Sequence, residues 1–200
     1  AIDKDSGAIY IQASVKHGYG TIKLDTSGNC DQNFFARSTY PHHGNIAVDS
    51  VGNVYMSRLF SNLAASKGSG PVIYKYGSDG TKLAEWGYIG DNDEEFSGKQ
   101  HSLVSLAIGK NGFVYASDSG KGEIKKFTSD GTFVSRWEGM TVGVGIPQDG
   151  YFSKSLIPSY APPPLHISID DSTGNIYVTD SCNQHDCRDH KKRIQVFSPF

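Results

Sequence analysis

The sequence predicts an all-β fold built from four-stranded antiparallel units, and two observations support it. First, residues 46–86 contain four short runs of alternating apolar and polar residues, separated by turn-forming Gly, Asn and Asp. Second, the pattern recurs, and its marker tyrosines are 45, 60 and 62 residues apart at Tyr10, Tyr55, Tyr115 and Tyr177. A repeat of about 40 to 50 residues with four strands is typical of a β-propeller, in which each repeat forms one blade.

Four repeats are visible, and we expect each to form one blade of a single domain. Their approximate boundaries are residues 1–40, 41–90, 101–140 and 164–200. The first repeat retains little of its inner strand, has a glycine-rich turn at 17–20, and is expected to place strands at 8–13, 21–24 and 30–37. The fourth stops before an outer strand. Because incomplete blades leave unpaired edges, we expect the chain to be part of a longer protein. The alternatives are that it closes as an unusual four-bladed ring or that its open edges pair with another chain.

Short motifs recur at equivalent points of the repeats. They are Ile46-Ala47-Val48-Asp49 with Gly52-Asn53-Val54-Tyr55, then Val114-Tyr115-Ala116-Ser117-Asp118, Asn175-Ile176-Tyr177-Val178-Thr179-Asp180 and Arg193-Ile194-Gln195-Val196-Phe197. On these residues the chain resembles the NHL-repeat family of β-propellers over nearly its whole length. The resemblance implies a ring of six blades, of which four are visible, and it implies little about function because one propeller scaffold hosts many activities.

The chain departs from this repeat pattern at three positions. Arg58 and Ala13 stand where later repeats have Asp118 and Asp180, and Gly109 replaces the aspartate of the other inner-strand ends.

Composition and charge limit the classes of partner. The 11 Tyr, 10 Phe and 23 Gly suit many short strands joined by turns. A formal charge of −2 gives no overall attraction for nucleic acid or anionic lipid. No apolar run approaches the roughly 18 residues that span a bilayer.

Three cysteines are present, and two of them lie close together in the fourth repeat. We expect Cys182 and Cys187 to form a local disulfide, which would leave Cys30 without a partner in this chain and would indicate an extracellular protein. The alternative is a zinc site formed by Cys182, His185, Cys187 and His190, since two thiolates and two imidazoles make a tetrahedral set. Their spacing is more compressed than in zinc fingers, which favours the disulfide.

Three histidines form a second candidate metal set. His43, His101 and His166 each lie near the start of an inner strand, and inner strands crowd around the axis of a propeller. The peptide-amidating lyases are similar in fold and hold zinc with histidines at such positions. Alternatively, each histidine caps a strand, because the three lie 12, 14 and 11 residues before their marker tyrosines.

Two segments exceed what the repeat requires and are candidates for binding loops. The insertion at 58–70 contains Arg58 and Lys67, and the connector at 138–164 contains Tyr151 and Tyr160. Binding residues are often carried by such loops, because a rigid scaffold positions them.

Two charged stretches have simpler explanations than a ligand site. Residues 91–95 resemble a calcium loop in composition, but the EF-hand spacing is absent, so a solvated acidic turn is favoured. The basic run 190–193, with Lys121, Lys125 and Lys126, suits RNA contact, yet the chain lacks the basic excess of such surfaces.

Our leading hypothesis is therefore a non-catalytic, extracellular propeller that binds proteins or assembles through its blade edges and loops. The first alternative is a metal-dependent lyase or hydrolase with a histidine-lined axial site that uses zinc or calcium. The second alternative is an RNA-binding propeller.

Overall fold

The computed structural model describes residues 1–15, 18–38, 43–58, 70–98, 104–138, 166–181 and 192–198. Within these ranges the chain forms strands in four sheets whose neighbouring strands all run antiparallel. No helix that is long and apolar enough to cross a membrane occurs in the same ranges. An all-β architecture of antiparallel sheets, as the sequence predicts, is thus confirmed.

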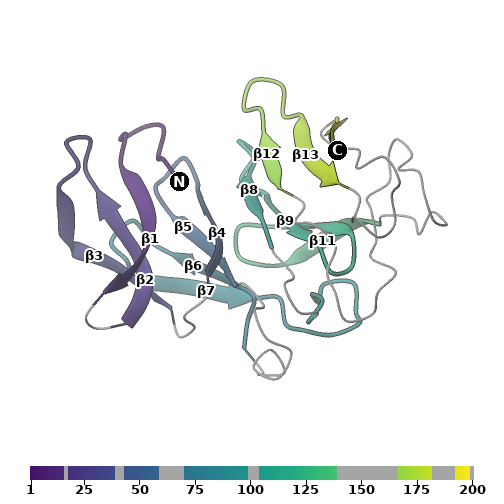
Figure 1. Ribbon diagram of the computed structural model, residues 1–200, viewed down its shortest axis with the longest axis horizontal. Coiled ribbons are helices and arrows are strands. Elements are labelled where there is room, and N and C mark those ends of the chain that lie inside the picture. Colours follow the sequence, from purple (N-terminus) through teal and green to yellow (C-terminus); the bar gives the residue numbers. More distant parts are fainter. Residues whose placement is uncertain are drawn as a thin grey trace.

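We call the sheets blades one to four, and each is built from consecutive strands (Figure 1). Blade one contains β1 (Ile9–Val15), β2 (Gly18–Leu24) and β3 (Cys30–Ser38). Blade two contains β4 (His43–Val48), β5 (Val54–Arg58), β6 (Ile73–Tyr76) and β7 (Lys82–Trp86). Blade three contains β8 (Leu106–Ile108), β9 (Val114–Asp118), β10 (Glu123–Phe127) and β11 (Phe133–Glu138). Blade four contains β12 (Ile167–Ile169), β13 (Ile176–Ser181) and β14 (Lys192–Phe197).

Blade one follows the expected order with one correction. Ile2 forms a bridge with Ile9, so the start of the chain occupies the position of an inner strand. The glycine-rich segment expected as a turn at 17–20 instead belongs to β2 from Gly18 onward. Gly20 is needed because β3 passes close by: a Cβ atom there would lie 2.4 Å from the carbonyl oxygen of Ala36. Gly20 therefore permits close approach of β2 and β3.

The blades pack face to face, which explains why their central strands are buried on both sides. Successive side chains of a strand point to opposite faces, so Val54 and Met56 join Tyr10 between blades one and two, while Tyr55 joins Phe127 between blades two and three. Tyr115 lies in the same way with Ile176 and Val178 of blade four. The core therefore consists of three apolar layers between neighbouring blades.

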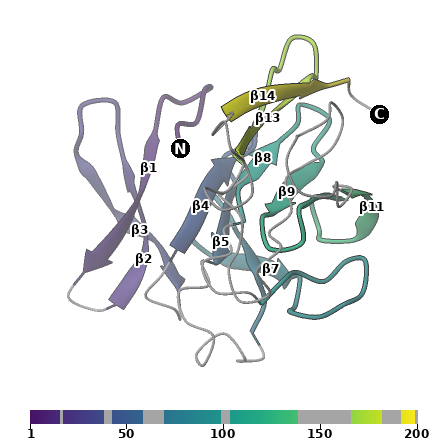
Figure 2. The same cartoon turned by 45° about the vertical axis from the view of Figure 1, so that its right-hand side comes forward.

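The inner strands of blades two, three and four lie side by side, because β8 contacts both β4 and β12. β4 also contacts β1 of blade one. Figure 1 and Figure 2 show the blades following one another from the purple β1–β3 to the yellow-green β12–β14. The described strands form no closed sheet, and the number of blades in a complete ring stays a prediction.

Candidate functional site at the starts of the inner strands

The inner strands β4, β8 and β12 have two ends with different character. Each continues into a short turn to the next strand, at 49–53, 109–113 and 170–175. The turns between third and fourth strands, at 25–29, 77–81 and 128–132, lie at the same end of the blades. We call this end the turn face. The opposite end, where inner strands start, is the strand-start face.

All long connections leave from the strand-start face. They join second to third strands or one blade to the next, at 59–72, 87–105, 139–166 and 182–191. In repeat architectures, extra sequence on one face commonly carries the binding function, because the repeats themselves supply the scaffold. The strand-start face is therefore the candidate functional face.

A repeated hydroxyl fixes the start of each inner strand to the second strand of the same blade. The hydroxyl of Ser57 accepts the backbone N–H of Asn45 at 2.8 Å, and that of Ser117 accepts the N–H of Ser105 at 3.0 Å. The hydroxyl of Thr179 accepts the N–H of His166 at 3.0 Å. Each hydroxyl belongs to the second residue after a marker tyrosine, so the sequence repeat encodes this contact.

A second set of hydrogen bonds joins neighbouring blades at the same level. The Asn45 side-chain oxygen accepts the N–H of Leu106 at 3.1 Å, and the Ser105 hydroxyl accepts the N–H of Ile167 at 3.4 Å. The Ser57 hydroxyl also donates to the carbonyl of Val104. Blades two, three and four are thus held in fixed relation where the inner strands start.

Two of the three predicted histidines are described, and both lie at this face. β4 begins at His43, and His166 directly precedes β12. His166 is exposed, and its carbonyl accepts the N–H of Thr179 at 2.9 Å. His101 lies outside the described residues. Within the described ranges, no group of three or more His, Cys, Asp or Glu side chains is placed to hold a metal ion.

Arg58 has a different place from the one expected. We expected it in a surface binding loop, but it is the last residue of β5, is paired with His43 across the sheet, and is only 5% exposed. The reason is that β5 extends through position 58, so the insertion begins one residue later. A guanidinium beside the start of β4 places a buried positive charge at the strand-start face.

Blade three carries a buried charged cluster that the sequence did not reveal. The Lys125 ammonium lies 2.7 Å from the Glu123 carboxylate, which is also 3.0 Å from the Arg136 guanidinium. At the end of β9, the Asp118 carboxylate accepts the N–H groups of Ser97, Gly120 and Lys121. Burial raises the pKa of the Asp118 carboxyl and lowers that of the Lys121 ammonium.

This cluster corrects the basic surface considered for RNA contact. Lys125 and Lys126 are buried, the first against Glu123 and the second with its ammonium 4.2 Å from the centre of the Phe113 ring. They therefore cannot present charge to a nucleic acid.

The acidic turn at 91–95 is held by lysines of the same cluster. The Lys121 ammonium donates to the carbonyls of Asn92 and Glu95, and the Lys125 ammonium donates to the carbonyl of Asp93 at 2.7 Å. These carbonyls already accept hydrogen bonds from ammonium groups, which is an arrangement unsuited to a calcium ion.

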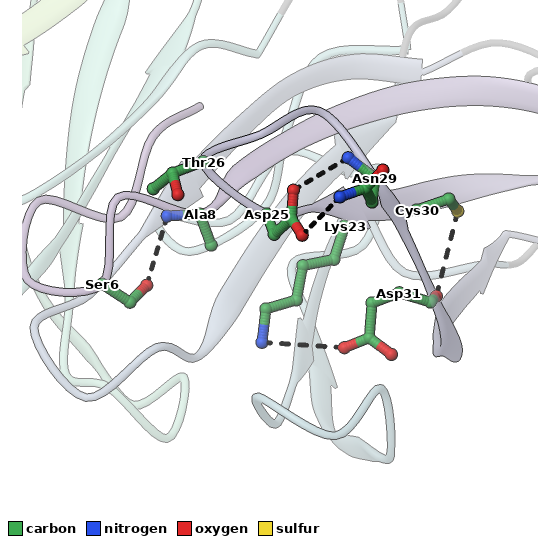
Figure 3. A pocket seen from close by; sticks show the side chains of 8 residues that line it. All are labelled: Ser6, Ala8, Lys23, Asp25, Thr26, Asn29, Cys30 and Asp31. Atoms are coloured by element: carbon green, nitrogen blue, oxygen red, sulfur yellow. Dashed lines mark hydrogen bonds and ion pairs between the residues drawn. The ribbon is translucent and has the colours of Figure 1, made fainter.

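A polar hollow of about 450 Å³ lies on blade one (Figure 3). Both oxygens of Asp25 are occupied within its own turn, by the N–H groups of Ser27 and Asn29 and by the Asn29 side chain. The free thiol of Cys30 is exposed beside it. Because Asp25 is satisfied locally, we interpret the hollow as the flank of a turn.

The remaining predicted site residues lie outside the described residues. They are Lys67, Tyr151, Tyr160, His101 and the set Cys182, His185, Cys187 and His190. The disulfide and the alternative zinc site therefore stay predictions.

Comparison with known proteins gives no match to a protein-family model and none to a curated protein. Solved structures do match. A gluconolactonase from Xanthomonas campestris has 14% sequence identity and a TM-score of 0.52, and the match covers 100% of this chain and 61% of that one. Virginiamycin B lyase from Staphylococcus aureus has 11% identity and a TM-score of 0.47, with 98% and 56% covered. An auxiliary nutrient binding protein from Bacteroides ovatus has 10% identity and a TM-score of 0.49, with 100% and 41% covered.

The match to the gluconolactonase supports a β-propeller fold for this chain. At this identity the likeness concerns the fold alone. The chain spans between 41% and 61% of the length of these three structures. The narrower link to the NHL-repeat family stays a prediction.

Proposed function

We propose that the chain belongs to a propeller enzyme, a metal-dependent hydrolase or lyase whose reaction takes place at the strand-start face. The observation that carries this proposal is the position of His43 and His166 at the starts of two inner strands on the face with the long connections. Nitrogen ligands from His43, His101 and His166 are of the type that zinc takes. The gluconolactonase match supports the choice of a hydrolytic reaction over a purely structural role.

The chain's own residues would position the metal ligands in this enzyme. The hydroxyls of Ser57, Ser117 and Thr179 and the bonds from Asn45 and Ser105 fix the relative positions of the inner-strand starts. A divalent ion bound there would polarise a substrate carbonyl and lower the pKa of a bound water. In lactone hydrolysis, water would add to the ring carbonyl, the ring acyl C–O bond would then break with a proton passing to the leaving oxygen, and a hydroxy acid would result.

The experiment measures metal content and lactone hydrolysis in purified protein. We expect near-stoichiometric zinc or calcium and turnover of glucono-1,5-lactone in a pH-stat assay. His166→Ala should lose both and remain folded, because His166 holds Thr179 through backbone atoms only. Lys82→Ala, an exposed change at the start of β7, is the control that should keep both. Metal-free protein without hydrolytic activity would overturn the proposal.

A second candidate function, protein binding through an open blade face, is supported by a separate observation. The third strands of blades two, three and four carry an isoleucine at the same position, namely Ile73, Ile124 and Ile194. Each isoleucine lies two residues before the residue that pairs across the sheet with the marker tyrosine of its blade. Ile73 and Ile124 are 0% and 2% exposed because the next blade covers them, whereas Ile194 is 66% exposed. Tyr177 and Val196 are exposed on the same face.

The partner that fits this face is a further blade whose apolar side resembles that of blade four. Sedimentation of the purified chain should then show concentration-dependent association, and Ile194→Lys should abolish it. Leu83→Lys, an exposed apolar position on β7 of blade two and away from both open blade faces, is the matched control. A wild-type chain that remains monomeric at all concentrations would contradict this second function.

A further inference from the structure

A cavity of about 470 Å³ opens at the turn face, at the other end of the inner strands from His43 and His166. The first turns of all four blades contribute to it, through Asp5, Val51, Lys110 and Asp171 among others. Its volume is in the range of sites for small molecules, about 300–1,000 Å³. The cavity is separate from the face proposed for catalysis.

Most charges in this cavity are already satisfied. The Asp49 carboxylate accepts four hydrogen bonds, from the N–H groups of Val51 and Asn53, the Asn53 amide and the Tyr55 hydroxyl. Asp171 forms an ion pair with Lys4 across the cavity mouth. Lys75 donates to the carbonyl of Ser129 at 3.1 Å and lies over the Tyr55 ring.

Two charged side chains differ from these. Among the described residues, the Lys110 ammonium and the Asp5 carboxylate form no hydrogen bond or ion pair, and both line the cavity. Lys110 therefore offers three donors and Asp5 offers two acceptor oxygens to a ligand.

The same cavity has apolar surface for the rest of a ligand. Ile2 and Val51 are exposed at its rim, and Val48 and Ile108, the ends of β4 and β8, are half-buried in its wall. Burial of these aliphatic groups by a ligand would contribute roughly 25 cal/mol for each Å² removed from water.

We propose that this cavity binds a small zwitterion with an aliphatic body. The ligand's carboxylate pairs with the Lys110 ammonium, and its ammonium pairs with the Asp5 carboxylate. Its aliphatic part covers Ile2 and Val51. A ligand with one charge would leave either Lys110 or Asp5 unpaired beside the apolar surface, which is less favourable than pairing both.

The test uses leucine as the probe and two analogues that each lack one charge. 4-Methylpentanoate lacks the ammonium group, and 3-methylbutylamine lacks the carboxylate. In titrations followed by amide NMR shifts, we expect leucine to shift Val51, Gly109 and Gly112 saturably. Each analogue should bind at least about threefold more weakly, the scale of one exposed ion pair.

Variants then assign the two charged contacts. Lys110→Gln and Asp5→Asn should each weaken leucine binding about three- to fivefold. Lys110→Gln should bind 3-methylbutylamine, which lacks the carboxylate, as well as wild type does. Asp5→Asn should bind 4-methylpentanoate, which lacks the ammonium, as well as wild type does. Lys82→Gln and Glu94→Gln, exposed changes outside the cavity, are the controls and should leave binding unchanged. Absence of saturable shifts, or equal affinity for leucine and both analogues, would overturn the proposal. His166→Ala should leave it intact, which separates this test from that of the enzyme.

Discussion

Asn45 of blade two accepts a hydrogen bond from the backbone N–H of Leu106 of blade three at 3.1 Å. The bond joins the start of β4 to the start of β8. Leu106 is buried, so its N–H has little access to water. A single side chain thus helps to set the spacing of two inner strands at the face where His43 and His166 lie.

The first prediction concerns this bond. Asn45→Ala removes the acceptor and leaves a buried N–H unpaired, which should lower the free energy of unfolding by about 1–3 kcal/mol. Asn45→Asp keeps an acceptor and should lower it less. Ser105→Ala removes the weaker 3.4 Å contact to Ile167 and should also cost less. Urea unfolding followed by tryptophan fluorescence measures all three. Equal stability of Asn45→Ala and wild type would contradict the prediction.

The second prediction compares two ion pairs of the same length. Lys125–Glu123 and Lys82–Glu85 are both 2.7 Å long, but their side chains are 0% and 5% exposed in the first pair and 52% and 37% in the second. Lys125→Met removes the buried ammonium and leaves the Glu123 carboxylate with the Arg136 guanidinium as its cationic partner, so the unfolding free energy should fall by about 1–3 kcal/mol. Lys82→Met should change it by less than about 1 kcal/mol.

A double variant shows what the buried pair contributes as a unit. The double variant, Lys125→Met with Glu123→Gln, removes both charges of the pair. It should be more stable than the sum of the two single losses predicts, because neither charge of the pair is left without the other. Additive losses in the urea experiment would mean that the two side chains do not interact as described.

The third prediction compares two glycines in equivalent turns. Gly28 and Gly131 have φ of 84° and 94° and both precede a fourth strand. A Cβ atom at Gly28 would meet nothing within 4 Å, whereas one at Gly131 would lie 2.6 Å from the Trp86 ring. Gly28→Ala should cost about 1–2 kcal/mol from the left-handed backbone alone.

Gly131→Ala should cost a further amount of about 1–3 kcal/mol, because the Trp86 ring must move within a packed layer. A change in Trp86 fluorescence in this variant alone would report that movement. If Gly28→Ala and Gly131→Ala lower the free energy of unfolding equally, the contact with Trp86 adds nothing to the cost of Gly131→Ala.

The strands were predictable because their signals are local. Alternation in Val54, Tyr55 and Met56 and the turn residues Asp49 and Gly52 lie within a few positions of each other, and they alone define β5 and the turn before it. The start of an inner strand at His43 followed from the register of the repeat. The length of the strand around Gly20 did not, because glycine serves both turns and close strand approach.

The charged cluster of blade three could not be predicted in the same way. Lys125 pairs with Glu123 two residues away but also holds Asp93, and Arg136 closes the cluster from another strand. Opposite charges at positions i and i+2 of a strand share one face, and that was the available signal in Glu123 and Lys125. Sequence alone could not show that the segment around Asp93 and Phe96, which precedes blade three, covers this face.

The last prediction concerns the pH dependence of the Asp170 turn. Hydrogen bonds from the Ser172 hydroxyl, the Ser172 N–H and the Thr173 hydroxyl lower the pKa of the Asp170 carboxyl from 3.8 to about 2. The pKa is lower in the folded state, so the turn contributes stability above pH 3.8 and loses it as pH falls toward 2. Wild type should therefore be more stable than Asp170→Asn at neutral pH, with the difference vanishing near pH 2. Ser172→Ala should raise the carboxyl titration midpoint in carbon-detected NMR; an unchanged midpoint would show that the Ser172 hydroxyl does not stabilise the carboxylate.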